Sequence, residues 1–177
     1  AVEISDIIFQ TKGPNGGAVM IEWNLASKQG ESGMWDSHVR IGGSLGTKLE
    51  STNCPTTQGN NPKQECQGVF LMFHATSASK GIYLENTWFW VADHDLDTNS
   101  PRQISVYSGR GVLVESPGPT WFWGTASEHS IFYNYQFKDT SAFFGGFMQT
   151  ETPYMQPVPL APAPFDFNIE YDDPTFT

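Results

Sequence analysis

Basic residues are scarce in this sequence. Nine Lys and Arg stand against nineteen Asp and Glu among 177 residues, which gives a formal net charge of −10. A field of this sign repels nucleic-acid phosphates and anionic lipid surfaces, so we expect no nucleic-acid partner and no membrane partner. A neutral polysaccharide meets no such repulsion and fits this charge balance.

Long apolar runs are also absent. No stretch approaches the roughly 18 residues that cross a bilayer. The first residues, AVEISDIIF, lack the basic start and apolar centre of a signal peptide. We therefore expect the chain to begin at a mature terminus or inside a longer protein. Its length is enough for one compact domain with a core, but not for two.

Only two cysteines occur, Cys54 and Cys66, twelve positions apart in a segment rich in Pro, Gly, Asn and Gln. This spacing suits a disulfide that closes a surface loop, and such a bond stabilises a fold by about 3 kcal/mol. Two unrelated free thiols are the alternative. Few lysines, many aromatic residues and the cysteine pair together favour an oxidising setting, so we expect a secreted, extracellular protein.

Helical periodicity is almost absent. Short segments dense in β-branched and aromatic residues are instead bounded by Gly, Pro, Asn, Asp or Ser, which predicts an all-β fold. The predicted strands are Val2–Phe9, Ala18–Trp23, Asp36–Ile41, Val69–Ala75, Ile82–Ala92, Gln103–Tyr107, Gly111–Glu115, Thr120–Thr125, Ser130–Phe137 and Ala142–Gln149. The tail from Thr152 carries five prolines in TPYMQPVPLAPAPF and should run extended over a surface.

Three segments can be laid over one another: VEISDIIF, IYLENTWFWVA and SIFYNYQFKDT. Each reads as one short strand bending into the next, with Asn86 and Asn134 near corresponding corners. This pattern predicts a right-handed parallel β-helix, and the scarcity of hairpin turn signals disfavours a sandwich or an up-and-down barrel. No cap is recognisable at either end, so we expect residues 1–151 to be part of a longer stack.

Gly42–Gly46 matches G-x-S-x-G, the nucleophile elbow of α/β-hydrolases. The elbow requires a strand that turns sharply into a helix. The residues that follow, TKLESTNCP, are too short and broken to form that helix. A Gly-rich turn is therefore the better interpretation.

Asp93–Asp97, the string DHDLD, is a candidate metal cluster. An EF-hand loop starting at Asp93 needs Gly and Glu where Thr98 and Ile104 stand, and one His is too few for zinc. Irregular calcium binding stays open as an alternative. The favoured interpretation is that these carboxylates face a sugar or a backbone amide, so we expect no metal and no cofactor.

The aromatic residues are clustered. Trp88 and Trp90 share one face of a strand, as do Trp121 and Trp123, because alternate residues point to opposite sides. Core packing accounts for most of these rings. At least one Trp near a strand end is a candidate platform for the apolar face of a sugar ring.

Glu128 ends a strand-like segment, and Glu151 stands just before the Pro-rich tail. Glycoside hydrolysis needs two carboxyl groups, one that protonates the leaving oxygen and one that assists water or acts as a nucleophile. The aromatic surroundings, including Tyr154, could provide the desolvated setting that the acid requires. The spacing alone favours two solvated or capping carboxylates over a catalytic pair.

Five strings resemble consecutive blocks of the exo-β-1,3-glucanases of glycoside hydrolase family 55: MWDSHVRIGG, YLENTWFWVADHDLD, ISVYSGRGVLVES, GPTWFWGTASEH and QTETPYMQP. The similarity runs in order from Ala1 to about Pro164. It implies part of the second of two tandem pectin-lyase-like β-helices, with the active site in the cleft between them. It also implies exo-hydrolysis with inversion that releases glucose, as by a glucan 1,3-β-glucosidase.

The resemblance implies a role for each matching residue. Glu151 would be the general acid, and Glu128 would hold and polarise the water. Tyr154 would line the subsite of the terminal glucose. Trp90 would pack against that glucose, and Asp93 would hydrogen-bond to it. The blocks of the first β-helix are missing, so we expect a companion chain that carries them. A non-catalytic glucan-binding fragment and a structural β-helix adhesin are the competing hypotheses.

Overall fold

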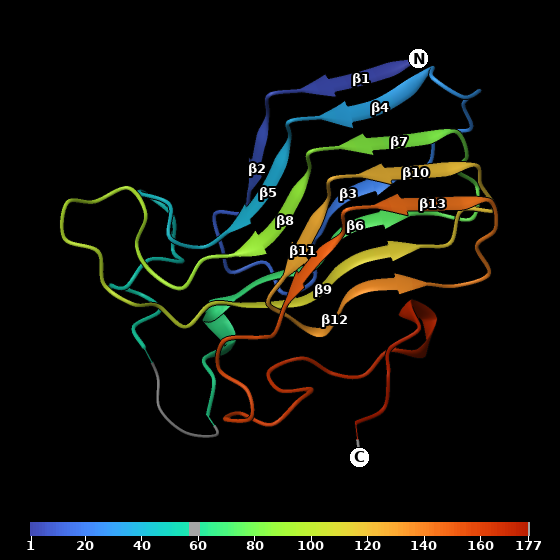
Figure 1. Ribbon diagram of the computed structural model, residues 1–177. Helices are drawn as coiled ribbons and strands as arrows, with labels where there is room; N and C mark the ends of the chain where they lie inside the picture. Colours follow the sequence, from blue (N-terminus) through green and yellow to red (C-terminus); the bar gives the residue numbers. More distant parts are fainter. Residues whose placement is uncertain (57–60, 177) are drawn as a thin grey trace.

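The computed structural model describes residues 1–56 and 61–176, which form an all-β fold (Figure 1). Within this part of the chain the strands assemble into three sheets whose strand pairs are all parallel. Sheet A consists of β1 (Val2–Ser5), β4 (Ser32–Trp35), β7 (Ile82–Glu85), β10 (Thr120–Trp123) and β13 (Phe143–Gly146). Sheet B consists of β2 (Ile8–Gln10), β5 (His38–Ile41), β8 (Trp88–Val91), β11 (Ala126–Glu128) and β14 (Gln149–Glu151). Sheet C consists of β3 (Val19–Trp23), β6 (Gln67–Ala75), β9 (Tyr107–Val114) and β12 (Ser130–Phe137).

The chain visits sheets A, B and C in turn, and each such circuit adds one strand to each sheet. Among residues 1–56 and 61–176, two 3-10 helices lie outside the sheets, η1 (Gln64–Cys66) and η2 (Ile169–Tyr171). In the described residues no helix has the length and apolar character that crossing a membrane would take.

The corners between sheets A and B share one backbone feature, a residue in the left-handed region. These corner residues are Asp6, Asp36, Asn86, Gly124 and Phe147, with φ of 58°, 49°, 49°, 61° and 55°. Asp, Asn and Gly tolerate this conformation, because glycine has no Cβ and short polar side chains can hydrogen-bond locally. Phe147 is the one corner residue of these five without either property.

The core lies between the three sheets and follows from strand alternation. In sheet A the inward residues Met34, Leu84 and Phe122 are fully buried, and in sheet B so are Val39 and Phe89. Their sequence neighbours point outward, because successive side chains of a strand alternate between faces. The outer face of sheet B therefore displays side chains that the core does not need.

The predicted fold class requires correction. The all-β part is confirmed, but the prediction of a right-handed parallel β-helix, as a fragment of a tandem two-β-helix enzyme, was wrong. The structure defines an all-β chain with three parallel sheets of five, five and four strands. One of the three overlaid segments does not correspond to the others: VEISDIIF and IYLENTWFWVA turn the corner from sheet A to sheet B, whereas SIFYNYQF is the single strand β12 of sheet C. Asn134 lies inside β12 and not at the corner that Asn86 occupies.

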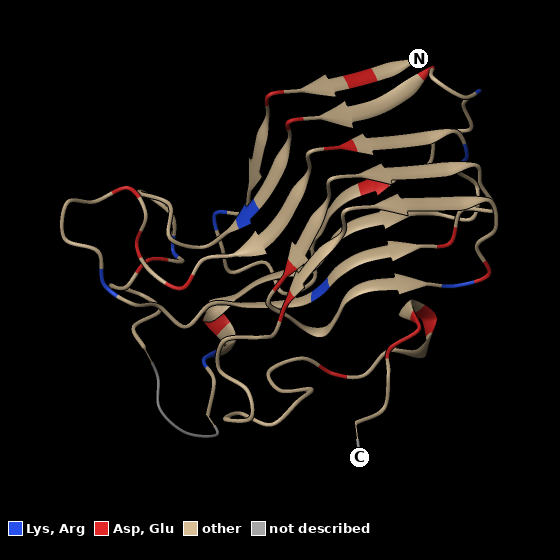
Figure 2. Ribbon diagram, viewed as in Figure 1, with Lys and Arg blue, Asp and Glu red and all other residues tan. Residues whose placement is uncertain are grey.

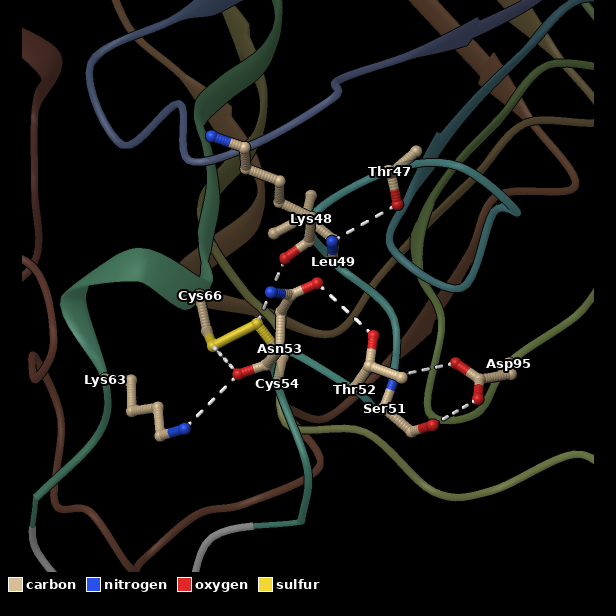
Figure 3. Close-up of a disulfide and its surroundings, with 10 residues drawn as sticks. All are labelled: Thr47, Lys48, Leu49, Ser51, Thr52, Asn53, Cys54, Lys63, Cys66 and Asp95. Atoms are coloured by element: carbon tan, nitrogen blue, oxygen red, sulfur yellow. Dashed lines mark hydrogen bonds between the residues drawn. A yellow bond between two sulfur atoms is a disulfide. The ribbon is translucent and has the colours of Figure 1, made fainter.

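The predicted disulfide is confirmed, since Cys54 and Cys66 are bonded to each other (Figure 3). Asp95 binds the segment just before this loop: its carboxylate accepts hydrogen bonds from the Ser51 amide, at 2.8 Å, and from the Ser51 hydroxyl, at 2.5 Å. Asp97 instead pairs with Arg40 at 3.3 Å. Two carboxylates of the DHDLD string are thus used by neighbouring protein groups. No cluster of three or more His, Cys, Asp and Glu within the described part of the chain is arranged to hold a metal ion.

The segment after β14 runs below β12 in Figure 1 and contacts sheet C. The Phe70 and Tyr171 rings meet edge to face at 4.7 Å, and the Tyr133 hydroxyl donates to the Tyr171 carbonyl at 2.9 Å. Arg110 on β9 forms an ion pair with Asp173 of this segment, and both side chains are fully buried.

Candidate active site

Sheet B places the two candidate catalytic carboxylates side by side. Glu128 ends β11, Glu151 ends β14, and the two residues are direct partners in the parallel pairing of these strands. Adjacent strands lie about 4.8 Å apart, so partner side chains on one face are neighbours. Figure 2 shows the ends of β11 and β14 as adjacent red segments. We refer to Glu128 and Glu151 as the carboxylate pair.

The two members of the carboxylate pair have different environments. The Glu128 side chain is 5% exposed, whereas that of Glu151 is 54% exposed. Trp88 on β8 donates its indole N–H to Glu128 Oε2 at 2.8 Å. Gln149 donates its side-chain N–H to Glu151 Oε1 at 3.1 Å. One carboxylate is therefore fixed in a desolvated position, and the other is accessible to a ligand.

His129 joins the two carboxylates. Its Nε2 lies 3.8 Å from Glu128 Oε2 and 3.7 Å from Glu151 Oε2. Its Nδ1 lies 2.7 Å from the Thr152 carbonyl oxygen. A carbonyl oxygen only accepts, so Nδ1 must carry a hydrogen, which fixes the ring orientation and leaves Nε2 facing both carboxylates. Sequence reasoning missed this residue, although it directly follows Glu128 in the GTASEH block.

Tyr154 packs on the other side of this histidine. The Tyr154 and His129 rings stack with centroids 3.7 Å apart and an interplanar angle of 22°. Burial raises the pKa of Tyr154 to about 12, and the negative charges of Asp93, Glu151 and Glu128 add to the effect. The phenol is therefore neutral at any ordinary pH and remains a hydrogen-bond donor.

Two cavities adjoin this group. The first has a volume of about 360 Å³ and is lined by Asp93 and Tyr154 together with Thr56, Gln103, Ile104, Ser105, Met155 and Val158. The second has a volume of about 630 Å³ and is lined by the carboxylate pair, Trp88, Phe147 and Gln149, with other residues of the corner. Both volumes fall within or near the range of small-molecule sites, about 300–1,000 Å³. The stacked His129–Tyr154 pair connects them, because Tyr154 lines the first cavity and His129 faces the carboxylates of the second.

Trp90 occupies a different position from the other predicted site residues. It is half-buried on β8, and its ring stacks on that of Trp88 at 4.3 Å with an angle of 11°. It is not among the residues that line either cavity. Asp93, in contrast, lies in the first cavity, where its carboxylate contacts His94 Nδ1 at 2.5 Å. The structure thus brings Glu128, Glu151 and Tyr154 close together, with Asp93 in the adjoining cavity. Trp88 and His129, which were not predicted as site residues, join this group.

No protein-family model matches the chain. The chain is 47% identical over 176 residues to a protein of Penicillium expansum named non-secreted LysM effector LysM15. It is 46% identical over 178 residues to a probable glucan endo-1,3-β-glucosidase of Arthroderma benhamiae. It is 44% identical over 177 residues to a glucan 1,3-β-glucosidase of Cochliobolus carbonum.

These three alignments cover 99–100% of this chain. They cover only 12%, 20% and 22% of the respective relatives, so the chain spans about a fifth or less of the proteins it resembles. The chain is therefore similar throughout its length to one part of fungal proteins, two of which are named as β-1,3-glucan hydrolases.

Proposed function

We propose that this chain is the acid-bearing part of a β-1,3-glucan hydrolase of the glycoside hydrolase family 55 type. In this proposal the enzyme acts on chain ends, inverts configuration and releases glucose. The observation that supports it best is the carboxylate pair: two glutamates in register on adjacent strands, one buried and one accessible, with His129 between them. Residues 1–151 would form one wall of the cleft, and the segment from residue 152 onward would run along the surface.

The environments of the two glutamates support different roles. Glu128 accepts the Trp88 N–H, which fixes its carboxyl group in a position suited to hold and polarise a water molecule. Glu151 is the more exposed carboxyl group and lines the larger cavity, so it is the member positioned to give a proton to a leaving oxygen.

The terminal glucose would occupy the first cavity. Its lining offers the Asp93 carboxylate as an acceptor for sugar hydroxyl groups and the neutral Tyr154 phenol as a donor. Trp90 lines neither cavity and stacks on Trp88 of the second, so in this proposal its ring would reach the glucose only in the completed cleft. No metal or cofactor takes part in this scheme.

An inverting reaction also needs a water molecule on the face of the sugar opposite to the acid. Glu128 would hold this water through its carboxylate, which Trp88 fixes in place, but a single carboxylate does not enclose a water molecule. We therefore infer that groups from outside this chain complete the water site. They would come from the remainder of a longer protein or from a companion chain.

We also infer that the protein is secreted. The Cys54–Cys66 disulfide supports an oxidising environment, because such bonds persist outside the reducing cytosol.

A non-catalytic β-glucan-binding fragment is the second candidate function. It is favoured by the relative that is named an effector and not a hydrolase. The same cavities and aromatic rings would serve binding alone. The two candidates differ in whether the carboxylate pair turns substrate over.

Replacing Glu151 with Gln in the complete protein tests the proposal. The amide keeps the shape but cannot transfer a proton, so kcat on laminarin should fall by about 10²–10⁴-fold. A β-glucoside with a good leaving group needs little protonation and should be affected much less. Glu128→Gln should slow both substrates, because water must be activated in either case.

Glu3→Gln, an exposed carboxylate on β1, is the matched control and should leave both rates unchanged. Hydrolysis of laminarin by Glu151→Gln at the wild-type rate would refute the assignment of the acid. Binding of laminarin without hydrolysis by the wild-type protein would favour the binding fragment.

A further inference from the structure

Phe147 is anomalous among the corner residues. Its φ of 55° is a conformation that the other four corners fill with Asp, Asn or Gly. A bulky side chain in this region is strained, and such strain concentrates at functional sites. Yet the residue is 82% exposed, so its ring adds little to the core. Neither backbone preference nor core packing explains a phenylalanine at this corner.

Two further aromatic rings join Phe147 on the outer side of sheet A. Trp123 at the end of β10 stacks on Phe144 of β13 with an interplanar angle of 12°, and Phe147 stands edge-on to Trp123 at 5.7 Å. Trp123 and Phe144 are 44% and 47% exposed. We call these three residues the aromatic corner patch. Flat, near-parallel rings of this kind present a face on which sugar rings can stack.

A glycine allows the Trp123 ring to lie flat. Gly146 is the register partner of Trp123, and a Cβ at Gly146 would come within 3.0 Å of the indole. At the neighbouring corner, a Cβ at Gly124 would meet no atom within 4 Å. The space beside Phe147 is therefore open.

The aromatic corner patch is continuous with the second cavity. Phe147 belongs to both, and Gln149 and the carboxylate pair line the same cavity. Phe147 precedes Glu151 by four residues, so the ring stands up to about 13 Å from the acid along the strand direction. A substrate that reaches from Glu151 to the patch must extend beyond the sugar at the cleaved bond.

The wall of this cavity also carries unpaired polar groups. Thr87 Oγ1 and His38 Nδ1 are buried atoms without a hydrogen-bond partner among the described residues, and both residues line the second cavity. Buried polar atoms normally find partners, so these two side chains carry unused hydrogen-bonding capacity, which a side-chain rotation would turn toward a ligand in the cavity. A ligand rich in hydroxyl groups meets this requirement, and a neutral one suits a chain of net charge −10.

We propose that the aromatic corner patch and the second cavity bind the leaving-group side of a β-1,3-glucan chain, two or more glucose units beyond the cleaved bond. This inference rests on the proposed function. The terminal glucose lies in the first cavity, the cleaved bond lies at the carboxylate pair, and the rest of the chain crosses the second cavity to stack on Phe147 and Trp123.

The test compares substrates of two lengths with the complete protein. Phe147→Asn removes the ring and supplies a residue that the equivalent corner at Asn86 already accepts. Its kcat/KM on laminarihexaose should fall by about 3- to 10-fold, whereas kcat/KM on laminaribiose should stay within twofold of wild type. Phe167→Asn, an exposed phenylalanine of the C-terminal segment, is the matched control and should change neither value.

Accessibility gives a second, independent readout. The cysteines of the chain are paired, so a bulky maleimide should label Phe147→Cys in the complete protein as fast as Phe167→Cys. With Glu151→Gln added to both cysteine variants, so that the oligosaccharide stays intact, bound laminarihexaose should slow labelling at position 147 only.

Three outcomes overturn the inference. Equal losses on both substrates would show a structural role, and no loss on either would show that the ring does not touch substrate. Failure of Phe147→Cys to label would mean that another part of the protein covers the patch. Absence of glucan hydrolysis by the wild-type protein at every chain length would instead refute the proposed function itself.

Discussion

The buried ion pair between Arg110 and Asp173 allows a prediction with a definite magnitude. Arg110 donates from Nε to Asp173 Oδ1 at 2.6 Å and from Nη2 to the other carboxylate oxygen. Its guanidinium lies between the Phe70 and Phe132 rings, 4.0 and 4.4 Å from their centroids. The Asn168 amide donates to Asp173 Oδ2 at 2.7 Å. The pair connects sheet C to the C-terminal segment.

Asp173→Asn should destabilise the fold by about 3–5 kcal/mol. The change leaves a buried guanidinium without its counter-charge and turns an amide donor toward an arginine donor. Arginine cannot release its proton, so the charge stays buried. Arg110→Met should cost less, because the remaining Asp173 keeps the Asn168 hydrogen bond and can take up a proton. The double change Arg110→Met with Asp173→Leu should approach the wild-type stability, since apolar replacements of buried pairs are often neutral.

Urea denaturation curves of the four proteins would give these free energies of unfolding. Limited proteolysis of the C-terminal segment would show whether that segment is released first. Asp166→Asn, an exposed aspartate of the same segment, serves as the control and should lie within about 0.5 kcal/mol of wild type. This reasoning would be refuted if Asp173→Asn lowered the free energy of unfolding by less than about 1 kcal/mol. It would also be refuted if the double variant were no more stable than Asp173→Asn.

Two further predictions concern the site. Trp88→Phe removes the N–H donor to Glu128 but keeps a ring against Trp90. Hydrogen bonds to charged groups are worth about 1.5–3 kcal/mol, so the kcat of this variant on laminarin should fall at least tenfold. Trp90→Phe removes no such donor, so its kcat on laminarin should fall less. Equal losses of kcat in the two variants would contradict the assigned role of Trp88. Tyr154 should ionise near pH 12 in a difference titration against Tyr154→Phe, and a midpoint near 10 would contradict its burial. Because the raised pKa favours the neutral phenol in the folded state, the associated stability is complete below pH 10 and is lost as the pH rises through about 12.

Sequence reasoning located most strand-forming regions, and the overlay of three segments predicted a bend in each of them, but it did not separate bent segments from straight strands. Val2–Phe9 and Ile82–Ala92 were each predicted as one strand, and each is two strands with a left-handed residue between them. Asp6 and Asn86 are the residues that make the bends. An apolar–polar pattern of this length does not distinguish a bent pair of strands from a straight strand such as β12, which explains why Asn134 was assigned to a corner.

The opposite error occurred at β9, which the sequence divided into Gln103–Tyr107 and Gly111–Glu115. The structure has one strand from Tyr107 to Val114 with two glycines inside it. A Cβ at Gly109 would come within 2.7 Å of the Phe70 carbonyl, and one at Gly111 within 2.2 Å of the Ser127 hydroxyl. These glycines allow neighbouring segments to pack closely against the strand. In the sequence alone they were interpreted as a break between two strands.

The candidate site shows the same limit. Glu128 and Glu151 were identified by resemblance, because their spacing of twenty-three residues says nothing about proximity. Their register as partners on β11 and β14 depends on the length of a whole circuit of the chain. His129 could be found only from its contacts, since its position between the carboxylates depends on a φ of 65° and on the Thr152 carbonyl.

The circuit architecture has a consequence for how such a cleft can vary between related proteins. Each circuit adds one strand to sheet B, so the floor of the site lengthens only in steps of about 4.8 Å. Glu128 and Glu151 stand on consecutive steps, and any change that preserves the circuits preserves their spacing. Variation is then confined to the connections that leave the sheets, such as the disulfide loop after β5 and the segment between β8 and β9. The lining of the cavities can change there by insertion or deletion, while the spacing of the carboxylate pair stays constant.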